Sequence, residues 1–146
     1  MKRILVALLI IFALLSPVCY AADKHEVSIG YTPVCKHYES GEDLNEEIHL
    51  VMVSVDQWTF ATYNNSHFER SYFAGRTFRT DKKVYRDKLY CRFNLTVGLL
   101  TGYEGELPGV GNVTIVPLPT FELGHKNFSI ETMILPLFGC LFKYTF

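Results

Sequence analysis

The sequence predicts an all-β fold, an eight-stranded antiparallel β-barrel that spans the outer membrane of a Gram-negative bacterium. Three observations support this prediction. Apolar and polar residues alternate along residues 84–100 and again along 137–146, which is the period of a strand with one apolar and one polar face. Turn-forming residues divide the rest of the chain into segments of strand length. The chain also ends on alternating aromatic residues that lead to Phe146.

Length and composition restrict the class of protein. The chain has 146 residues, 49% of them hydrophobic and 20% charged, with 14 basic and 15 acidic side chains. This length favours one domain with an ample apolar content. The near-neutral balance argues against a nucleic-acid partner, and the abundant aromatic residues argue against a disordered chain.

The first 21 residues have the three-part pattern of a secretory signal peptide. Met1-Lys2-Arg3 is positive, residues 4–15 are an unbroken apolar run, and small residues follow at Ala21 and Ala22. The apolar run is too short to span a bilayer. We therefore expect cleavage after Ala21 or Ala22, and a single barrel domain over residues 22–146.

The remaining chain is predicted to form eight strands. The clearest lies within 84–101, where the odd positions from Leu89 to Leu99 are apolar and the even positions from Tyr90 to Gly98 are mostly polar. Turn signals at positions such as Asp56-Gln57 and Ser66-His67 separate the others. The predicted strands are 26–38, 46–55, 57–66, 69–79, 84–101, 112–123, 127–135 and 137–146.

Three all-β architectures fit eight strands: a soluble sandwich, a lipocalin-like barrel and an outer-membrane barrel. Eight transmembrane strands of about 9–11 residues with tight turns need about 100 residues, which this chain provides. An outer-membrane barrel also predicts aromatic residues at its two interfaces and polar side chains inside. By parity, Arg92, Glu131 and Lys143 would point inward and fill a lumen too narrow for a water channel. The predicted interface aromatics are Tyr31, Trp58, Phe60, Tyr72, Tyr85, Phe93, Phe121, Phe128 and the terminal aromatics.

The C-terminus favours the membrane barrel among these three. A chain that ends Phe-Lys-Tyr-Thr-Phe, with Phe146 last, resembles the signal that the outer-membrane assembly machinery recognises in bacterial barrels. We therefore expect a monomeric barrel in contact with membrane lipids.

The cysteine pattern predicts neither a disulfide framework nor a metal site. Cys35, Cys91 and Cys140 remain after the signal peptide, and an odd number cannot form a closed set of bridges. No spacing typical of metal ligands is present. Packing on strands is the main interpretation, with one bridge and one free thiol as the alternative. We predict no cofactor.

Several motifs resemble those of the outer-membrane lipid A palmitoyltransferases, the PagP-type barrels. A subset of short phage and proteobacterial relatives is similar in carrying a Tyr-x-Asn-Ser motif. Over about two thirds of the mature chain the order and spacing of the motifs match. The matching residues are His37, Asn45-Glu46, Tyr63–Gly75 with its Asn65-Ser66, Gly98–Tyr103, Ile115–Pro119 and Leu135-Pro136.

The resemblance implies acyl transfer from a phospholipid to lipid A. It assigns the catalytic roles to His37, Asn65 and Ser66, and strand topology would bring all three to one rim. His37 could act as general base, and Ser66 as nucleophile or as a hydrogen-bond donor to the oxyanion. Asn65 stands where the family has Asp, and an amide cannot stabilise an imidazolium by charge. Glu46 could supply that charge.

Two functions remain open from the sequence. The first is an acyltransferase, which predicts an apolar pocket inside the barrel with His37 and Ser66 at its mouth. The second is a small non-enzymatic barrel that alters the host surface. If a phage encodes it, its role could be to exclude a second infection. This second function predicts a lumen filled by side chains. Pro117 and Pro119 would each remove a strand hydrogen bond. This indicates a bulge or a strand edge at a rim or, as the resemblance implies, a lateral opening for an acyl chain.

Overall fold

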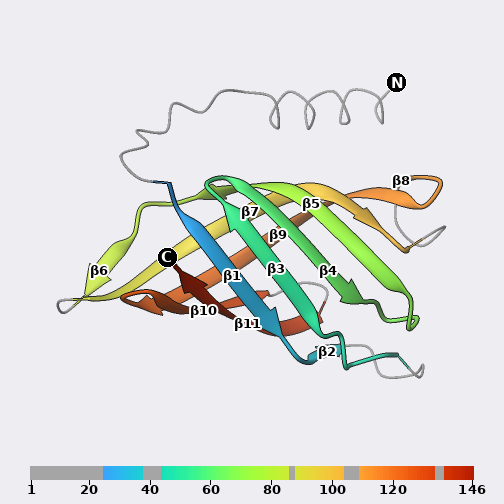
Figure 1. Ribbon diagram of the computed structural model, residues 1–146, viewed down its shortest axis with the longest axis horizontal. Coiled ribbons are helices and arrows are strands. Elements are labelled where there is room, and N and C mark those ends of the chain that lie inside the picture. Colours follow the sequence, from blue (N-terminus) through green and yellow to red (C-terminus); the bar gives the residue numbers. More distant parts are fainter. Residues whose placement is uncertain (1–24, 38–43, 86–87, 104–108, 134–136) are drawn as a thin grey trace.

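The computed structural model describes residues 25–37, 44–85, 88–103, 109–133 and 137–146, which form one closed antiparallel β-barrel (Figure 1). Each wall strand pairs with the next one along the chain, and the first pairs with the last. The eight walls are β1 (Val27–Thr32) with its continuation β2 (Cys35–His37), β3 (Leu50–Val55), β4 (Trp58–Asn64), β5 (Arg70–Arg79), β7 (Leu89–Thr101), β9 (Val113–His125), β10 (Phe128–Met133) and β11 (Leu137–Thr145). The predicted eight-stranded antiparallel barrel is thus confirmed as a fold.

Three predicted strands differ from those observed. Residues 84–101 do not form one strand, because β6 (Lys83–Tyr85) folds back and pairs with the start of β7, Tyr85 opposite Leu89. The second predicted strand, 46–55, begins only at Leu50. Before it, the side chain of Asn45 accepts a hydrogen bond from the Glu47 amide at 3.0 Å, which shapes a turn instead. The predicted first strand, 26–38, is interrupted at Pro33 and Val34, between β1 and β2.

The two ends of the barrel differ. One end, called here the turn end, carries the two-residue turns Asp56-Gln57 and Lys126-Asn127 together with the start of β1 and the end of β11. The other, the loop end, carries the connection between β2 and β3, residues 65–69, and the hairpin of β8 (Gly109–Val110) with β9. Figure 1 shows β6 and the C-terminus toward one end, and β2 and β8 toward the other. The turn end also carries the β5–β7 connection with β6. Two-residue turns beside the first and last wall strands, with longer loops opposite, are typical of outer-membrane barrels.

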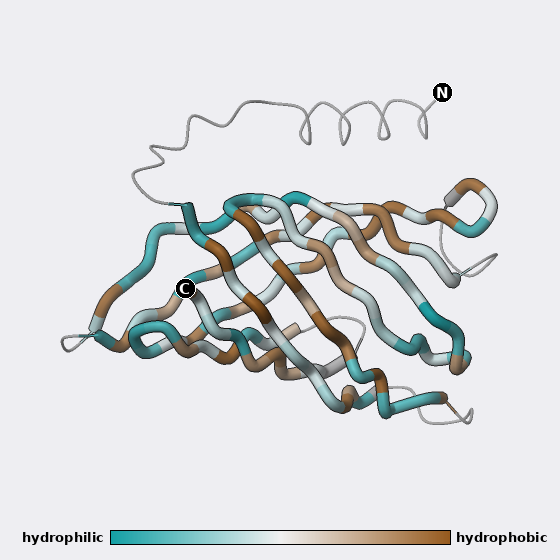
Figure 2. The backbone as a smooth tube through the Cα atoms, in the orientation of Figure 1, coloured by the Kyte–Doolittle hydropathy of each residue, from teal (hydrophilic) through white to brown (hydrophobic). Residues whose placement is uncertain are grey.

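Side chains alternate between an apolar outside and a polar inside. Along β1, for example, Ile29 is 47% exposed whereas Ser28 is 1% exposed. The same alternation of hydropathy can be followed along the tube in Figure 2. The individually named interface aromatics from Tyr31 to Phe128 are all exposed, as predicted. Arg92, Glu131 and Lys143 are buried inside, which confirms the predicted parity.

Candidate functional site

At the loop end, the backbone segment that follows Leu44 lies between the end of β2, at His37, and the turn that carries Asn65 and Ser66. The amide of Cys35 donates to the carbonyl of Glu46, and the amide of Asn45 donates to the carbonyl of Ser66, both at 2.9 Å. The segment that begins at Leu44 therefore lies between β2, which ends at His37, and the β4–β5 turn. The His37 side chain lies outside what the structure describes, so its geometry toward Ser66 stays a prediction.

Asn65 is a fully buried polar residue at this rim, and both polar atoms of its side chain are hydrogen-bonded. It is 0% exposed, and its Oδ1 accepts hydrogen bonds from the amides of His67 and Glu69, both at 2.9 Å. Its Nδ2 donates to the carbonyl of Gly102 at 2.8 Å, which joins the β4–β5 turn to the end of β7. Its own carbonyl accepts from the Asn45 side chain at 3.1 Å. The described contacts therefore give Asn65 a positioning role in three loop-end segments.

Gly102 allows this close approach. Its φ is +93°, and a Cβ at this position would lie 2.3 Å from Ser71 Oγ and 2.9 Å from Asn65 Nδ2. Only glycine tolerates both the backbone conformation and the contact. The rim is thus built from a buried amide and a glycine that fit each other.

A small hollow of about 470 Å³ lies beside β2 at the same end. Its lining residues are Val34, Cys35, Lys36, Glu46, Glu47, Gly139 and Cys140. Glu46, the carboxylate that the sequence offered in place of the family's Asp, is exposed there. Cys35, Cys91 and Cys140 are all free, which removes the alternative of a disulfide between any two of them.

The interior toward the turn end is filled by an ion-paired network, which we call the charged core. Glu122 is 0% exposed and lies 2.5 Å from Arg92 Nε and 2.9 Å from Lys143 Nζ. Lys143 also lies 3.0 Å from Glu131, and Arg92 lies 3.1 Å from Glu26. Such buried charges are tolerated only when each is paired and hydrogen-bonded.

Neutral side chains complete the charged core. Asn94 Nδ2 donates to Glu122 at 3.1 Å and to Glu131 at 3.0 Å. The Tyr90 hydroxyl donates to Glu122 at 3.1 Å, and the Thr120 hydroxyl donates to Glu131. The turn-end half of the lumen is therefore filled by paired charged side chains, as the inward parity of Arg92, Glu131 and Lys143 predicted. The sequence analysis did not name Glu122, the centre of the network. Glu122 alternates with its neighbours in the same way as Thr120 and Gly124, which face inward, so the alternation pattern could have identified it.

A row of hydroxyl groups crosses four neighbouring walls of the same interior. Ser54 Oγ lies 2.9 Å from Thr59 Oγ1, which lies 2.8 Å from Thr77 Oγ1, and Thr77 lies 2.9 Å from Thr96 Oγ1. Each hydroxyl can donate to one neighbour and accept from another. This row satisfies small polar groups that face the lumen without needing water.

The interior toward the loop end holds packed apolar side chains next to the buried polar residues Thr32, Ser71 and Thr114. Met52, Phe73, Leu100 and Leu141 are each less than 9% exposed. A Cβ on Gly30 would lie 2.9 Å from Leu141 Cδ1, and the ring of Phe73 covers Gly75 and Gly98, which face each other across β5 and β7. The packing around these glycines leaves no room for an added methyl group.

One edge of β9 explains the two prolines. β9 pairs with β7 over its whole length but with β10 only from Thr120 to His125. The Lys126 amide donates toward β7, to Lys88 at 3.3 Å, so even-numbered residues of β9 direct their amides toward β7 and odd-numbered ones toward β10. Pro117 and Pro119 therefore lack amides on the side where, among the described residues, no strand pairs with them. An edge of this kind fits both alternatives that the sequence left open, a strand edge at a rim and a lateral opening.

The described residues offer neither a membrane-spanning helix nor a cluster of metal ligands. None of their helices is long and apolar enough to cross a membrane. They also contain no group of three or more His, Cys, Asp or Glu side chains placed to hold a metal ion.

Comparison with known proteins identifies no relative. The chain matches no protein-family model and none of the curated proteins. The resemblance to the lipid A palmitoyltransferases therefore stays a prediction.

Proposed function

We propose that this protein is an integral outer-membrane β-barrel with a closed interior that acts at the cell surface through its loop end. The observation that carries the proposal is the inverted distribution of side chains, apolar outside and polar inside. A water-soluble barrel would bury the apolar set and expose the polar one. A barrel in lipid needs the opposite arrangement and a sheet without open edges.

The outward set is large and spread over all walls. It includes Val27, Ile29, Tyr31, Val51, Val53, Val55, Trp58, Phe60, Tyr72, Leu89, Phe93, Leu99, Val113, Phe121, Leu123, Phe128, Ile130 and Phe142, each more than a third exposed. Continuous exposed apolar surface of this extent marks contact with a membrane or a partner.

The filled lumen favours a non-enzymatic role. The charged core occupies the turn-end half, and the packed side chains around Met52 and Leu141 occupy the other. A barrel of eight strands has no spare volume for a water channel once its side chains are in place. The loop end is then the part available for recognition, and we propose that it alters a host surface receptor or its access, as in exclusion of a second phage.

Expression in a Gram-negative host tests this proposal in two steps. The protein should fractionate with the outer membrane and migrate faster on an SDS gel before boiling than after. Expression should then lower adsorption of phages that use one surface receptor, compared with an empty vector. Recovery in the soluble periplasm would contradict the membrane location, and unchanged adsorption across phages with different receptors would contradict the surface role.

Acyl transfer to lipid A is the second candidate, and the proline edge of β9 favours it. An unpaired edge between Ile115 and Pro119 is where a lipid chain could enter a barrel from the side. The test is the mass of lipid A from cells that lack their own palmitoyltransferase. An added acyl mass that disappears in His37→Ala and Ser66→Ala would support this candidate, and an unchanged mass with folded protein would exclude it.

A further inference from the structure

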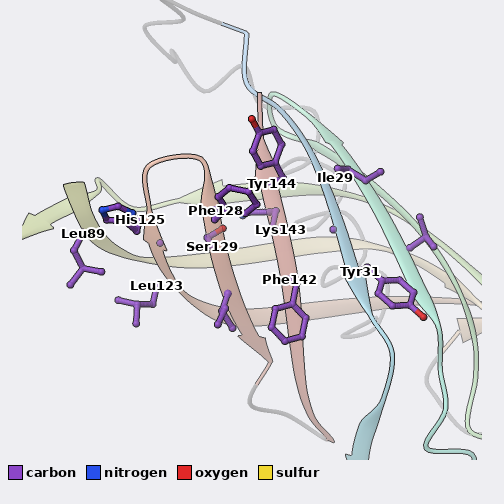
Figure 3. A pocket seen from close by; sticks show the side chains of 14 residues that line it. Ile29, Tyr31, Leu89, Leu123, His125, Phe128, Ser129, Phe142, Lys143 and Tyr144 are labelled. Carbon is purple, nitrogen blue, oxygen red and sulfur yellow. The ribbon is translucent and has the colours of Figure 1, made fainter.

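The outer wall carries a hollow of about 660 Å³ that the proposed surface role does not use (Figure 3). It lies across β1, β9, β10 and β11 and reaches β7 at Leu89 and β3 at Val51. We call it the wall hollow. Apolar side chains dominate its lining, among them Leu89, Leu123, Phe128, Ile130 and Phe142.

Aromatic side chains gather at the turn end of the wall hollow. The rings of Phe128 and Tyr144 lie 4.8 Å apart, and those of Tyr144 and Phe146 lie 4.9 Å apart. Aromatic clusters of this kind sit at the level of lipid headgroups in membrane barrels. This places the turn end of the hollow at the interface and its remainder at the depth of acyl chains.

Basic groups lie at the same end. His125 lines the hollow, and Figure 3 shows it beside Leu89 and Leu123. Lys126 follows it, and the Lys126 amide donates to the carbonyl of Lys88 at 3.3 Å, which holds the two lysine-bearing segments together. All three side chains are exposed.

We propose that the wall hollow binds an anionic phospholipid of the leaflet that faces the turn end. Its phosphate would lie near Lys88 and Lys126, and an acyl chain would extend along Leu123, Ile130 and Phe142. The change from basic to aromatic to apolar along one hollow matches the order of groups along a phospholipid. The inference rests on the proposed membrane location.

A second two-residue turn provides an internal comparison. Trp58, the single tryptophan of the chain, is the first residue of β4 after Asp56-Gln57, just as Phe128 is the first residue of β10 after Lys126-Asn127. Both side chains are exposed. The turn before Trp58 carries a carboxylate, that of Asp56, which lies 3.0 Å from the ring of His25, and no lysine. The two positions have similar depth and different charge.

Quenching of tryptophan fluorescence by brominated lipids tests the proposal. The full-length protein is placed in bilayers with brominated phosphatidylglycerol or brominated phosphatidylcholine. The reporters are native Trp58 and, in a second protein, Phe128→Trp combined with Trp58→Phe. At position 128 we expect the tryptophan to contact phosphatidylglycerol about fivefold more often than phosphatidylcholine, which is the contribution of one lysine near an anionic membrane surface. At position 58 we expect little difference between the two lipids.

Charge variants complete the test. Lys88→Gln with Lys126→Gln should remove most of the preference at position 128, while Lys36→Gln at the loop end should leave it unchanged. Equal preference at the two reporters, or preference that survives the double variant, would overturn the inference. Absence of quenching by either lipid at both positions would instead overturn the membrane location on which it rests.

Discussion

Asn65 shows how one side chain can organise a rim that the sequence describes only as a turn. Its amide group accepts from two backbone amides and donates to Gly102, so both of its polar atoms are used. An Asp could accept the same two hydrogen bonds but could not donate to the carbonyl of Gly102. The Asn that departs from the palmitoyltransferase pattern is therefore the residue type that this rim requires.

We expect Asn65→Asp to lower the free energy of unfolding by about 1–3 kcal/mol, because two oxygen atoms would face each other in a buried position. Urea unfolding in detergent micelles, followed by the heat-dependent gel shift, measures this loss. Asn64→Asp is the matched control, since the oxygen that accepts from Arg70 is retained there.

The same variant separates the two candidate functions. If Asn65 stands for a catalytic Asp, Asn65→Asp should add acyl mass to lipid A. If Asn65 positions the rim, the variant should only lose stability. An Asn65→Asp protein as stable as the wild type would contradict the structural role given to the amide.

At the scale of elements, the charged core joins strands that are distant in sequence. Glu122 on β9 contacts Arg92 on β7 and Lys143 on β11, and Lys143 also reaches Glu131 on β10. Glu26, just before β1, extends the network to the first wall. Because each charge has a partner, the network fixes which strands meet and in which register, a role best attested for buried polar groups in other folds.

We predict that Glu122→Gln destabilises the barrel by about 3–5 kcal/mol, because Arg92 and Lys143 would be left with excess positive charge in a buried site. The double variant Glu122→Gln with Lys143→Met should cost less than the sum of the two single variants. Urea unfolding of all four proteins in a double-mutant cycle measures the coupling. Additive effects would show that the charges act independently.

At the scale of the whole molecule, the outward face decides the environment of the barrel. Val53 lies in the middle of β3, paired with Ile29 on β1 and Phe60 on β4, and all three side chains face outward. Such a patch gains from contact with lipid and is unfavourable in water.

Val53→Lys should destabilise the protein by about 2–4 kcal/mol in bilayers, the cost of a lysine near the middle of a membrane barrel. Val110→Lys at the loop end is the control, because Val110 is 88% exposed beyond the main walls. Reversible unfolding in lipid vesicles gives both values. A Val53→Lys protein that is equally stable or more soluble would indicate a water-exposed barrel.

Much of the fold could be predicted, because parity is a local property of the chain. Alternation placed strands in all eight walls and correctly oriented Arg92, Glu131 and Lys143. It failed where a short-range contact competes with pairing, at Asn45 before β3 and at the β6 hairpin. Glu122 lies inside the predicted strand 112–123 and shares the inward parity of Thr120 and Gly124, but the prediction named only Arg92, Glu131 and Lys143 as inward charges.

The sequence by itself determined the number of strands, the apolar outside and the polar inside, since each depends on which residues alternate with their neighbours. Only the tertiary structure decided that β1 closes on β11, that Glu122 joins Arg92 to Lys143, and that Asn65 holds Gly102. These contacts join residues 21 to 117 positions apart, and their geometry depends on the register of every strand between them.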